Sequence, residues 1–114
     1  MDNCIFCKIA NKNSEGKIYE NLNFFSIPNN KPVIDGHSLV ISKKHFETTL
    51  DLPSSLGAEL LDCLKKTILK LIEQEKAEGF NIVNNNFESA GQVVKHVHYH
   101  ILPRKKGGEV PYCY

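Results

Sequence analysis

The sequence predicts an α+β fold in which one long helix packs on an antiparallel sheet. Several short runs of β-forming residues are joined by tight turns, and one long stretch in the middle of the chain has helical periodicity. The 114 residues suffice for one hydrophobic core and are too few for two cores of ordinary size. Residues 1–114 are therefore expected to form a single domain, with a mobile tail from about residue 104 to residue 114.

Five short segments have the pattern of strands. They cover residues 18–20, 24–28, 37–42, 80–83 and about 95–102. Residues 21–23 lie between the first two runs and are expected to form a hairpin turn. Pro103 is expected to stop the last strand, because proline has no N–H to donate to a sheet.

The helix is predicted over residues 53–78. Its apolar residues recur every three or four positions: Leu56, Leu60, Leu61, Leu64, Ile68, Leu71 and Ile72. Pro53 suits the first turn, Asp51 or Ser54 could cap it, and Gly79 is placed to end the helix in the left-handed conformation. One helix covers only one face of a sheet, so the other face must be solvated, bind a ligand or meet a second subunit.

Composition excludes several classes of protein. Fourteen basic and thirteen acidic residues give a net charge of +1, so no global field attracts the chain to a nucleic acid polymer or an acidic membrane. No apolar run approaches the length of a membrane span, and the first residues lack the pattern of a signal peptide. We expect a cytoplasmic protein. In that reducing compartment the four cysteines favour metal ligands or free thiols over disulfides.

Three of the five histidines alternate with apolar residues. In a strand, His96, His98 and His100 would share one face at intervals of about 6.6 Å. Such a row could be a solvated strand, part of a metal site, or a pair of catalytic groups at a phosphate. The preceding polar segment, residues 84–92, could form an ordinary surface loop or place amide donors near an anion.

Cys4 and Cys7 have the two-residue gap of a zinc knuckle, which lets both thiolates face one ion. Without a second pair nearby, this motif is half of a zinc signal. A thioredoxin-like redox motif would need a strand immediately before it, and no β-forming run precedes Cys4. Two free thiols are the alternative.

The histidine row resembles the signature of the histidine triad family, in which three histidines alternate with apolar residues. Three further blocks agree in order along the chain, namely residues 4–9, 36–41 and 43–45, and Ala90-Gly91-Gln92 precedes the row at the expected distance. The resemblance covers nearly the whole chain. It implies a five-stranded antiparallel sheet with one long helix, and a homodimer whose two sheets join into one of ten strands.

The resemblance also implies a hydrolase of purine nucleoside phosphoramidates or related nucleotides. His98 would attack the α-phosphate and form a nucleotidyl-histidine, His100 would hold a phosphate oxygen, and His37 would support them. Further ligands of the nucleotide are implied by position: Gln92 and Asn85 at phosphate and ribose, Asn29 at ribose, and Phe6, Ile9, Ile27 and Leu39 around the base.

Four positions depart from the family pattern, among them Phe87 in place of a loop glycine and Ser42 in place of a proline. Asn29 stands where many members have an acidic residue, and Val93 lacks the hydroxyl that many members direct at the leaving group. A dinucleoside polyphosphate hydrolase that uses the same residues is one alternative. A nucleotide-binding or partner-binding module with residual catalysis is another.

Some members of the family complete a tetrahedral zinc site with two histidines. The corresponding residues here are His45 and His96, and both are present along with Cys4 and Cys7. The resemblance therefore implies a structural zinc ion that ties the N-terminal segment to the histidine strand.

Overall fold

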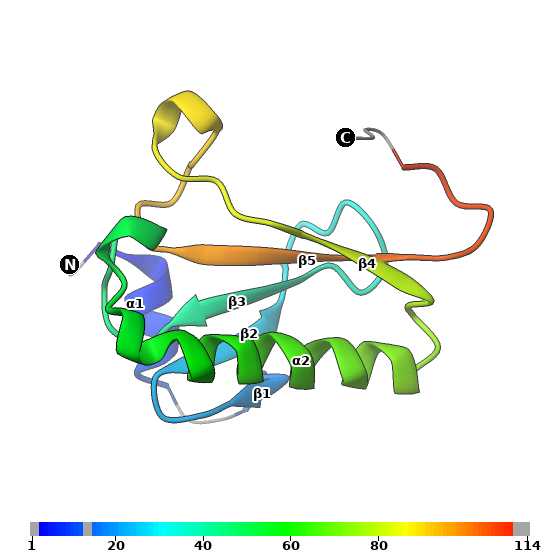
Figure 1. The fold of residues 1–114 in the computed structure, drawn as a ribbon, viewed down its shortest axis with the longest axis horizontal. Coiled ribbons are helices and arrows are strands. Elements are labelled where there is room, and N and C mark those ends of the chain that lie inside the picture. Colours follow the sequence, from blue (N-terminus) through cyan, green and yellow to red (C-terminus); the bar gives the residue numbers. More distant parts are fainter. Residues whose placement is uncertain (1–2, 13–14, 111–114) are drawn as a thin grey trace.

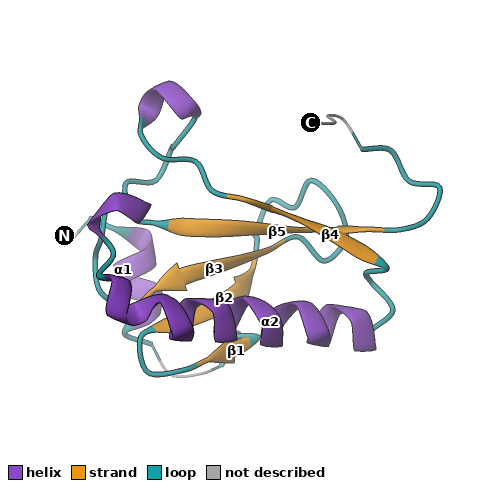
Figure 2. Ribbon diagram, viewed as in Figure 1, coloured by secondary structure: helices purple, strands orange, loops and turns teal. Residues whose placement is uncertain are grey.

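The computed structural model describes residues 3–12 and 15–110. Its centre is a five-stranded antiparallel sheet with the strand order β1-β2-β3-β5-β4 (Figure 1). The strands are β1 (Tyr19–Glu20), β2 (Phe24–Pro28), β3 (Ser38–Ser42), β4 (Gly79–Val83) and β5 (His98–Arg104). The long helix α2 (Gly57–Glu73) crosses one face, as Figure 2 shows. The predicted α+β fold is confirmed.

Residue alternation along the strands divides the core into two layers. On the α2 side, Val40, Tyr99 and Ile101 pack with Ile68 and Leu71 of the helix. On the opposite side, a smaller cluster forms around Phe25, Leu39 and Ile41, and the short helix α1 (Ile5–Ala10) covers it through Phe6. The second face, which one helix could not cover, is thus covered only in part.

β5 is displaced from its predicted position and does not stop at Pro103. It pairs with β3 on one side and with β4 on the other. Pro103 is opposite Phe80 of β4. The carbonyl of the next residue, Arg104, accepts from Glu78 N–H on the β4 side, so the ring nitrogen of Pro103 faces the β3 side, where pairing has already ended at Ser38 and Ile101. No N–H is needed there, so proline is tolerated. At the other end, His96 precedes the strand rather than lying within it.

The helix is shorter than its periodicity predicted. Residues Ser54–Leu56 form a separate 3₁₀ turn, and no side chain caps α2, so the predicted caps Asp51 and Ser54 were wrong. The helix ends at Glu73 because Glu75 takes the left-handed conformation, with φ 59°. Lys76 N–H then reaches the carbonyl of Leu71 at 2.9 Å, which closes the end of the helix. Gly79, the predicted terminator, instead begins β4.

Helix α1 was not predicted, because six residues are too few for an apolar period to register. Lys17 holds its C-terminal end: the buried ammonium donates to the carbonyls of Ala10 at 3.4 Å and Lys12 at 3.1 Å. The same ammonium lies 5.1 Å from the centre of the Phe25 ring. The segment that carries Cys4 and Cys7 is therefore fixed at its far end to the sheet.

The remainder of the chain is irregular. The proposed tail begins within β5 at Arg104, residues 105–110 are exposed, and residues 111–114 lie outside the described part of the chain. Among the helices of the described residues, none combines the length and apolar character that crossing a bilayer demands.

Candidate functional site

A cavity of about 710 Å³ lies on the face of the sheet opposite α2, where His98 and His100 project from β5. All of the expected nucleotide ligands except Gln92 line it: Phe6, Ile9, Ile27, Asn29, Leu39, Asn85, His98 and His100. Residues of the N-terminal segment form one wall and the loop after β4 forms another. The fold thus gathers side chains that are up to 95 positions apart in the sequence (Ile5 to His100) around one space.

The ring of His98 is held in one tautomer. Its Nδ1 is 2.7 Å from the main-chain carbonyl oxygen of His96, which can only accept a hydrogen bond. Nδ1 must therefore carry the proton, and in the neutral ring Nε2 keeps its lone pair. His98 accordingly presents a nucleophilic nitrogen.

The ring of His100 has the complementary tautomer. Val33 N–H donates to Nδ1 of His37 at 3.2 Å, so the proton of neutral His37 is on Nε2. That nitrogen lies 3.0 Å from Nδ1 of His100, which accepts the bond and leaves the proton of His100 on its own Nε2. The amide nitrogen of Asn29 lies 3.2 Å from His37 Nε2, and because both atoms are donors in this tautomer the contact is not a hydrogen bond. His100 thus offers a donor where His98 offers a lone pair.

Burial keeps these histidines neutral. It lowers the pKa of His37 and of His98 below the ordinary value of 6.5, although the hydrogen bond to the His96 carbonyl raises that of His98 in part. Burial, together with the neighbouring His98 and His37, lowers the pKa of His100 to about 4. Near neutral pH the site therefore holds uncharged imidazoles, the form that a nucleophile requires.

The loop after β4 directs one amide into the cavity and fixes its neighbours. Asn84 Nδ2 donates to the carbonyl of His98 at 3.0 Å, where the ladder between β4 and β5 has ended. Thr49 binds both flanking asparagines: its hydroxyl donates to Asn84 Oδ1 at 2.6 Å and its N–H to Asn86 Oδ1 at 2.8 Å. Asn85, between them, lines the cavity.

Gln92 does not line the cavity. Its Nε2 donates to the carbonyls of Glu47 at 2.6 Å and Val94 at 3.1 Å, and its Oε1 accepts from Phe87 N–H at 2.7 Å. All of these partners are main-chain groups. The side chain therefore fixes the path of the loop that leads to β5, and the phosphate contact expected for it stays a prediction.

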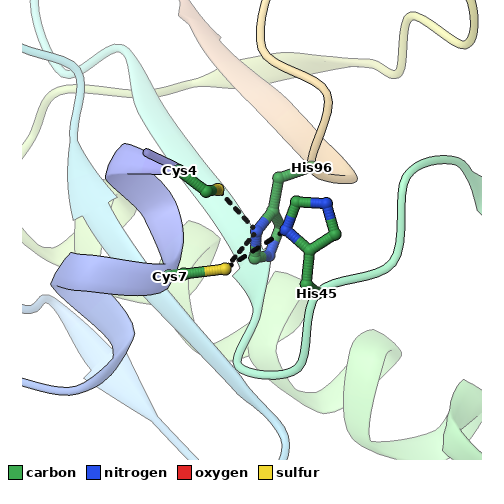
Figure 3. Close-up of side chains that lie close together, drawn as sticks. All are labelled: Cys4, Cys7, His45 and His96. Atoms are coloured by element: carbon green, nitrogen blue, oxygen red, sulfur yellow. Dashed lines mark hydrogen bonds between the residues drawn. The ribbon is translucent and has the colours of Figure 1, made fainter. Parts of the chain in front are cut away.

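A second cluster lies at the end of the sheet near the start of the chain (Figure 3). Cys4 and Cys7 approach from α1, His45 from the segment after β3, and His96 from the segment before β5. Their ligand atoms all lie within 4.8 Å of one another. The set expected from the sequence is thus assembled in space.

The donor atoms of this cluster suit a tetrahedral zinc ion. His96 Nε2 donates to the carbonyl of Ser42 at 2.7 Å, so its Nδ1 lone pair faces Cys4 Sγ at 3.3 Å and Cys7 Sγ at 3.5 Å. His45 Nδ1 is 3.2 Å from Cys7 Sγ. Ligands at zinc distances in a tetrahedron are separated by about 3.3–3.8 Å. Burial and the neighbouring Cys4 raise the pKa of the Cys7 thiol, an effect that a bound cation would reverse.

Several groups that shape the site were missed from the sequence. Three imidazole tautomers are set by main-chain groups, namely the carbonyls of Ser42 and His96 and the N–H of Val33. Because nearly every residue has these groups, the residue type does not show which of them bind a histidine. Thr49 lies between the predicted strand over residues 37–42 and the predicted helix over residues 53–78, and it belongs to no motif in the sequence. Asn84 and Asn86 were visible only as part of a polar loop.

A five-stranded antiparallel sheet in which β5 presents His98 and His100, separated by one residue, to a cavity is the architecture of the histidine triad proteins. The chain belongs to the HIT family, because the model of the HIT domain matches residues 10–107.

Relatives resemble the chain over most of its length. A HIT-like protein of Methanocaldococcus jannaschii is 41% identical over 94% of this chain and 84% of its own length. An adenosine 5'-monophosphoramidase of Candida albicans is 36% identical over 90% of this chain and 70% of its own. An adenylylsulfatase of Arabidopsis thaliana is 36% identical over 93% of this chain and 54% of its own.

Solved structures share the fold. A protein of Streptococcus mutans superposes with a TM-score of 0.87 at 35% identity, covering 100% of this chain and 73% of that one. A histidine triad protein of Clostridium difficile has a TM-score of 0.80 at 34% identity, covering 100% and 97%.

We predict that acid weakens the fold in part through His100. Its pKa is about 4 in the folded protein, whereas an unfolded histidine titrates near 6.5. As pH falls from 6.5 towards 4, the unfolded chain takes up a proton that the folded chain does not, so the free energy of unfolding decreases; above pH 6.5 this contribution is constant. His100→Asn, which cannot titrate, should show a shallower decline in urea unfolding across this range, with the metal content of both proteins held equal. An unchanged slope would contradict the assignment.

Proposed function

We propose that the protein is a nucleotidyl hydrolase that acts on purine nucleoside phosphoramidates or related nucleotides through a nucleotidyl-histidine. One observation carries the proposal: at the same cavity, neutral His98 offers an Nε2 lone pair and His100 offers an Nε2–H donor. A nucleophile beside a hydrogen-bond donor is what attack on a phosphate ester or amide requires. The named activities of the Candida and Arabidopsis relatives, both of which concern adenylyl compounds, support it.

In the first step, His98 Nε2 forms a bond to the α-phosphorus, and the bond from phosphorus to the leaving group breaks. The imidazole becomes positively charged, and the carbonyl of His96, which accepts the Nδ1–H bond, stabilises that charge. His100 donates to a non-bridging phosphate oxygen, on which charge builds. Apolar side chains of the cavity, Phe6, Ile9, Ile27 and Leu39, hold the base, and Asn29 binds the ribose.

In the second step, water attacks the phosphorus and gives up a proton to solvent, and the bond to His98 Nε2 breaks. This step releases a nucleoside monophosphate and restores the neutral ring, which keeps its proton on Nδ1. An amine leaving group takes up a proton as it departs. Val93, at the mouth of the cavity, is 90% exposed and has no group to supply that proton. We assign this proton to water.

His98→Ala should lower kcat for adenosine phosphoramidate by more than about a thousandfold, because it removes the nucleophile. His100→Ala should lower kcat by about a hundredfold, the effect of losing one donor to the transition state. Quenching the wild-type enzyme and labelled substrate with an alkaline denaturant, which preserves the phosphorus–nitrogen bond, should trap label on the protein, and His98→Ala should trap none.

Unchanged turnover of His98→Ala would exclude it as the nucleophile. Tight binding of AMP without turnover or a trapped intermediate would favour the binding-module alternative. A higher kcat/KM for a dinucleoside polyphosphate than for the phosphoramidate would favour the other hydrolase.

We also propose that Cys4, Cys7, His45 and His96 hold a structural zinc ion. The ion would supply four bonds that join α1, the segment after β3 and the segment before β5, and these bonds would leave no open position for chemistry. The fit of two sulfur and two nitrogen donors, with His96 fixed in the ligating tautomer, supports the proposal.

Elemental analysis should find about one zinc ion per chain, and Cys7→Ser should lose most of it. Removal of the metal by a chelator should lower the Tm, because structural zinc contributes directly to folding. Cys63→Ala is the matched control, since Cys63 belongs to α2 and is buried in the core on the other side of the sheet, and its loss should leave the zinc content unchanged. Metal-free protein with an undiminished Tm would contradict a structural zinc.

A homodimer, in which two sheets join, is proposed to form through β4. This strand lies at the edge of the sheet, and its Phe80 and Ile82 are 45% and 44% exposed. Unpaired edges with apolar side chains are normally covered. Phe80→Lys should shift the mass measured by light scattering from dimer to monomer, whereas Leu22→Lys, at an exposed apolar residue of the β1–β2 turn, should not. A wild-type monomer would refute this arrangement.

The cytoplasmic location expected from the sequence stays a prediction.

A further inference from the structure

The metal cluster and the cavity are joined by a row of aromatic rings in edge-to-face or tilted contact. The row runs through His45, His96, Phe6, His98, His100 and His37, and successive ring centroids are 4.8, 5.8, 5.0, 5.1 and 5.2 Å apart. These separations are those of favourable aromatic pairs. Phe6 is the one member that comes from neither the sheet nor its connecting segments.

Phe6 lies between the part of the row that belongs to the metal cluster and the part that lines the cavity. Its ring meets the ring of His96 at 83° and the ring of His98 at 69°, and it is 7% exposed. It therefore contacts a member of the metal cluster on one side and the proposed nucleophile on the other. It also lines the cavity, as Ile9 does one turn further along α1.

Helix α1 depends on such contacts for its place. It has six residues and no side-chain cap, and a helix of this length is unstable alone. Lys17 holds only its far end. At its near end, the described attachments are the packing of Phe6 and the approach of Cys4 and Cys7 to the two histidines.

We infer that the metal centre and the nucleotide cavity bind their ligands with positive coupling, with Phe6 as the positioning residue that joins them. Both ligands require the same placement of α1: the metal through Cys4 and Cys7, and the nucleotide through Phe6 and Ile9. When one ligand has fixed the segment, the other binds without the cost of ordering it. This inference rests on the proposed nucleotide site.

Coupling of this kind is reciprocal, which makes it measurable from both sides. If zinc increases the affinity for a nucleotide by some factor, the nucleotide must increase the affinity for zinc by the same factor. Calorimetric titration with AMP gives the first factor from the zinc-loaded and chelator-treated proteins. Competition with a zinc-binding dye, with and without saturating AMP, gives the second. We expect both factors to be equal and at least about fivefold.

Two variants separate a specific coupling from general loosening. Phe6→Leu keeps an apolar side chain in the wall but removes the ring contacts, so zinc should change its AMP affinity by less than about twofold even though the affinity itself falls. Ile68→Val weakens the core on the α2 side, away from α1, and should keep the wild-type factor. Circular dichroism of each chelator-treated protein shows whether the sheet persists before its titration is used.

AMP affinity that is the same with and without zinc, in protein whose sheet persists, would overturn the inference and leave the proposed hydrolase intact. A full zinc effect in Phe6→Leu would overturn the role of Phe6. A third outcome is a protein that shows equal increases of fivefold or more in AMP affinity and in zinc affinity and yet fails to hydrolyse the phosphoramidate. That result would support the coupling and refute the proposed reaction. If AMP bound to neither form, the inference and the nucleotide site would both be refuted.

Discussion

Two hydrogen bonds from imidazole to main-chain carbonyls decide what the site can do. The carbonyl of Ser42 takes the Nε2 proton of His96, and the carbonyl of His96 takes the Nδ1 proton of His98. Two histidines separated by one residue thus become opposite tautomers: one directs Nδ1 at two sulfurs and the other leaves Nε2 to the cavity. Because a carbonyl cannot donate, thermal motion does not readily exchange these roles. The metal cluster and the proposed chemistry both depend on this division.

The sequence was informative where residue type and period carry the structure. Alternation of His98 and His100 with apolar residues correctly predicted a strand with both imidazoles on one face. The same alternation misled at its start: His96 continues the pattern but precedes β5, because it turns towards the cysteines instead of pairing. The end of α2 was also misplaced, since Glu75 adopts a left-handed conformation for which glycine was the expected residue. Glutamate disfavours this conformation, but the chain must turn at Glu75 to reach β4.

Family resemblance predicted the members of both clusters but not how each side chain is used. Asn29, Asn85 and the apolar set do line the cavity, and the four metal-type residues do meet. Gln92, by contrast, uses its amide on main-chain partners. Nothing in the sequence distinguishes an amide that contacts ligand from one that shapes a loop, because both need the same donor and acceptor. The distinction arises only from where the backbone places neighbouring N–H and carbonyl groups.

The hydrogen bond from Val33 N–H to His37 makes the loop over residues 29–37 part of the proposed chemistry. Through His37 it fixes which nitrogen of His100 carries the proton, although the Val33 side chain is exposed and contributes no functional group. Surface loops ordinarily tolerate insertions and deletions. Here the connection from Asn29 to His37 has a length that this hydrogen bond requires, since one added residue would move that N–H away from the ring. Constraint in this loop should therefore appear as a fixed number of residues, while the identity of the side chain at position 33 remains free to vary.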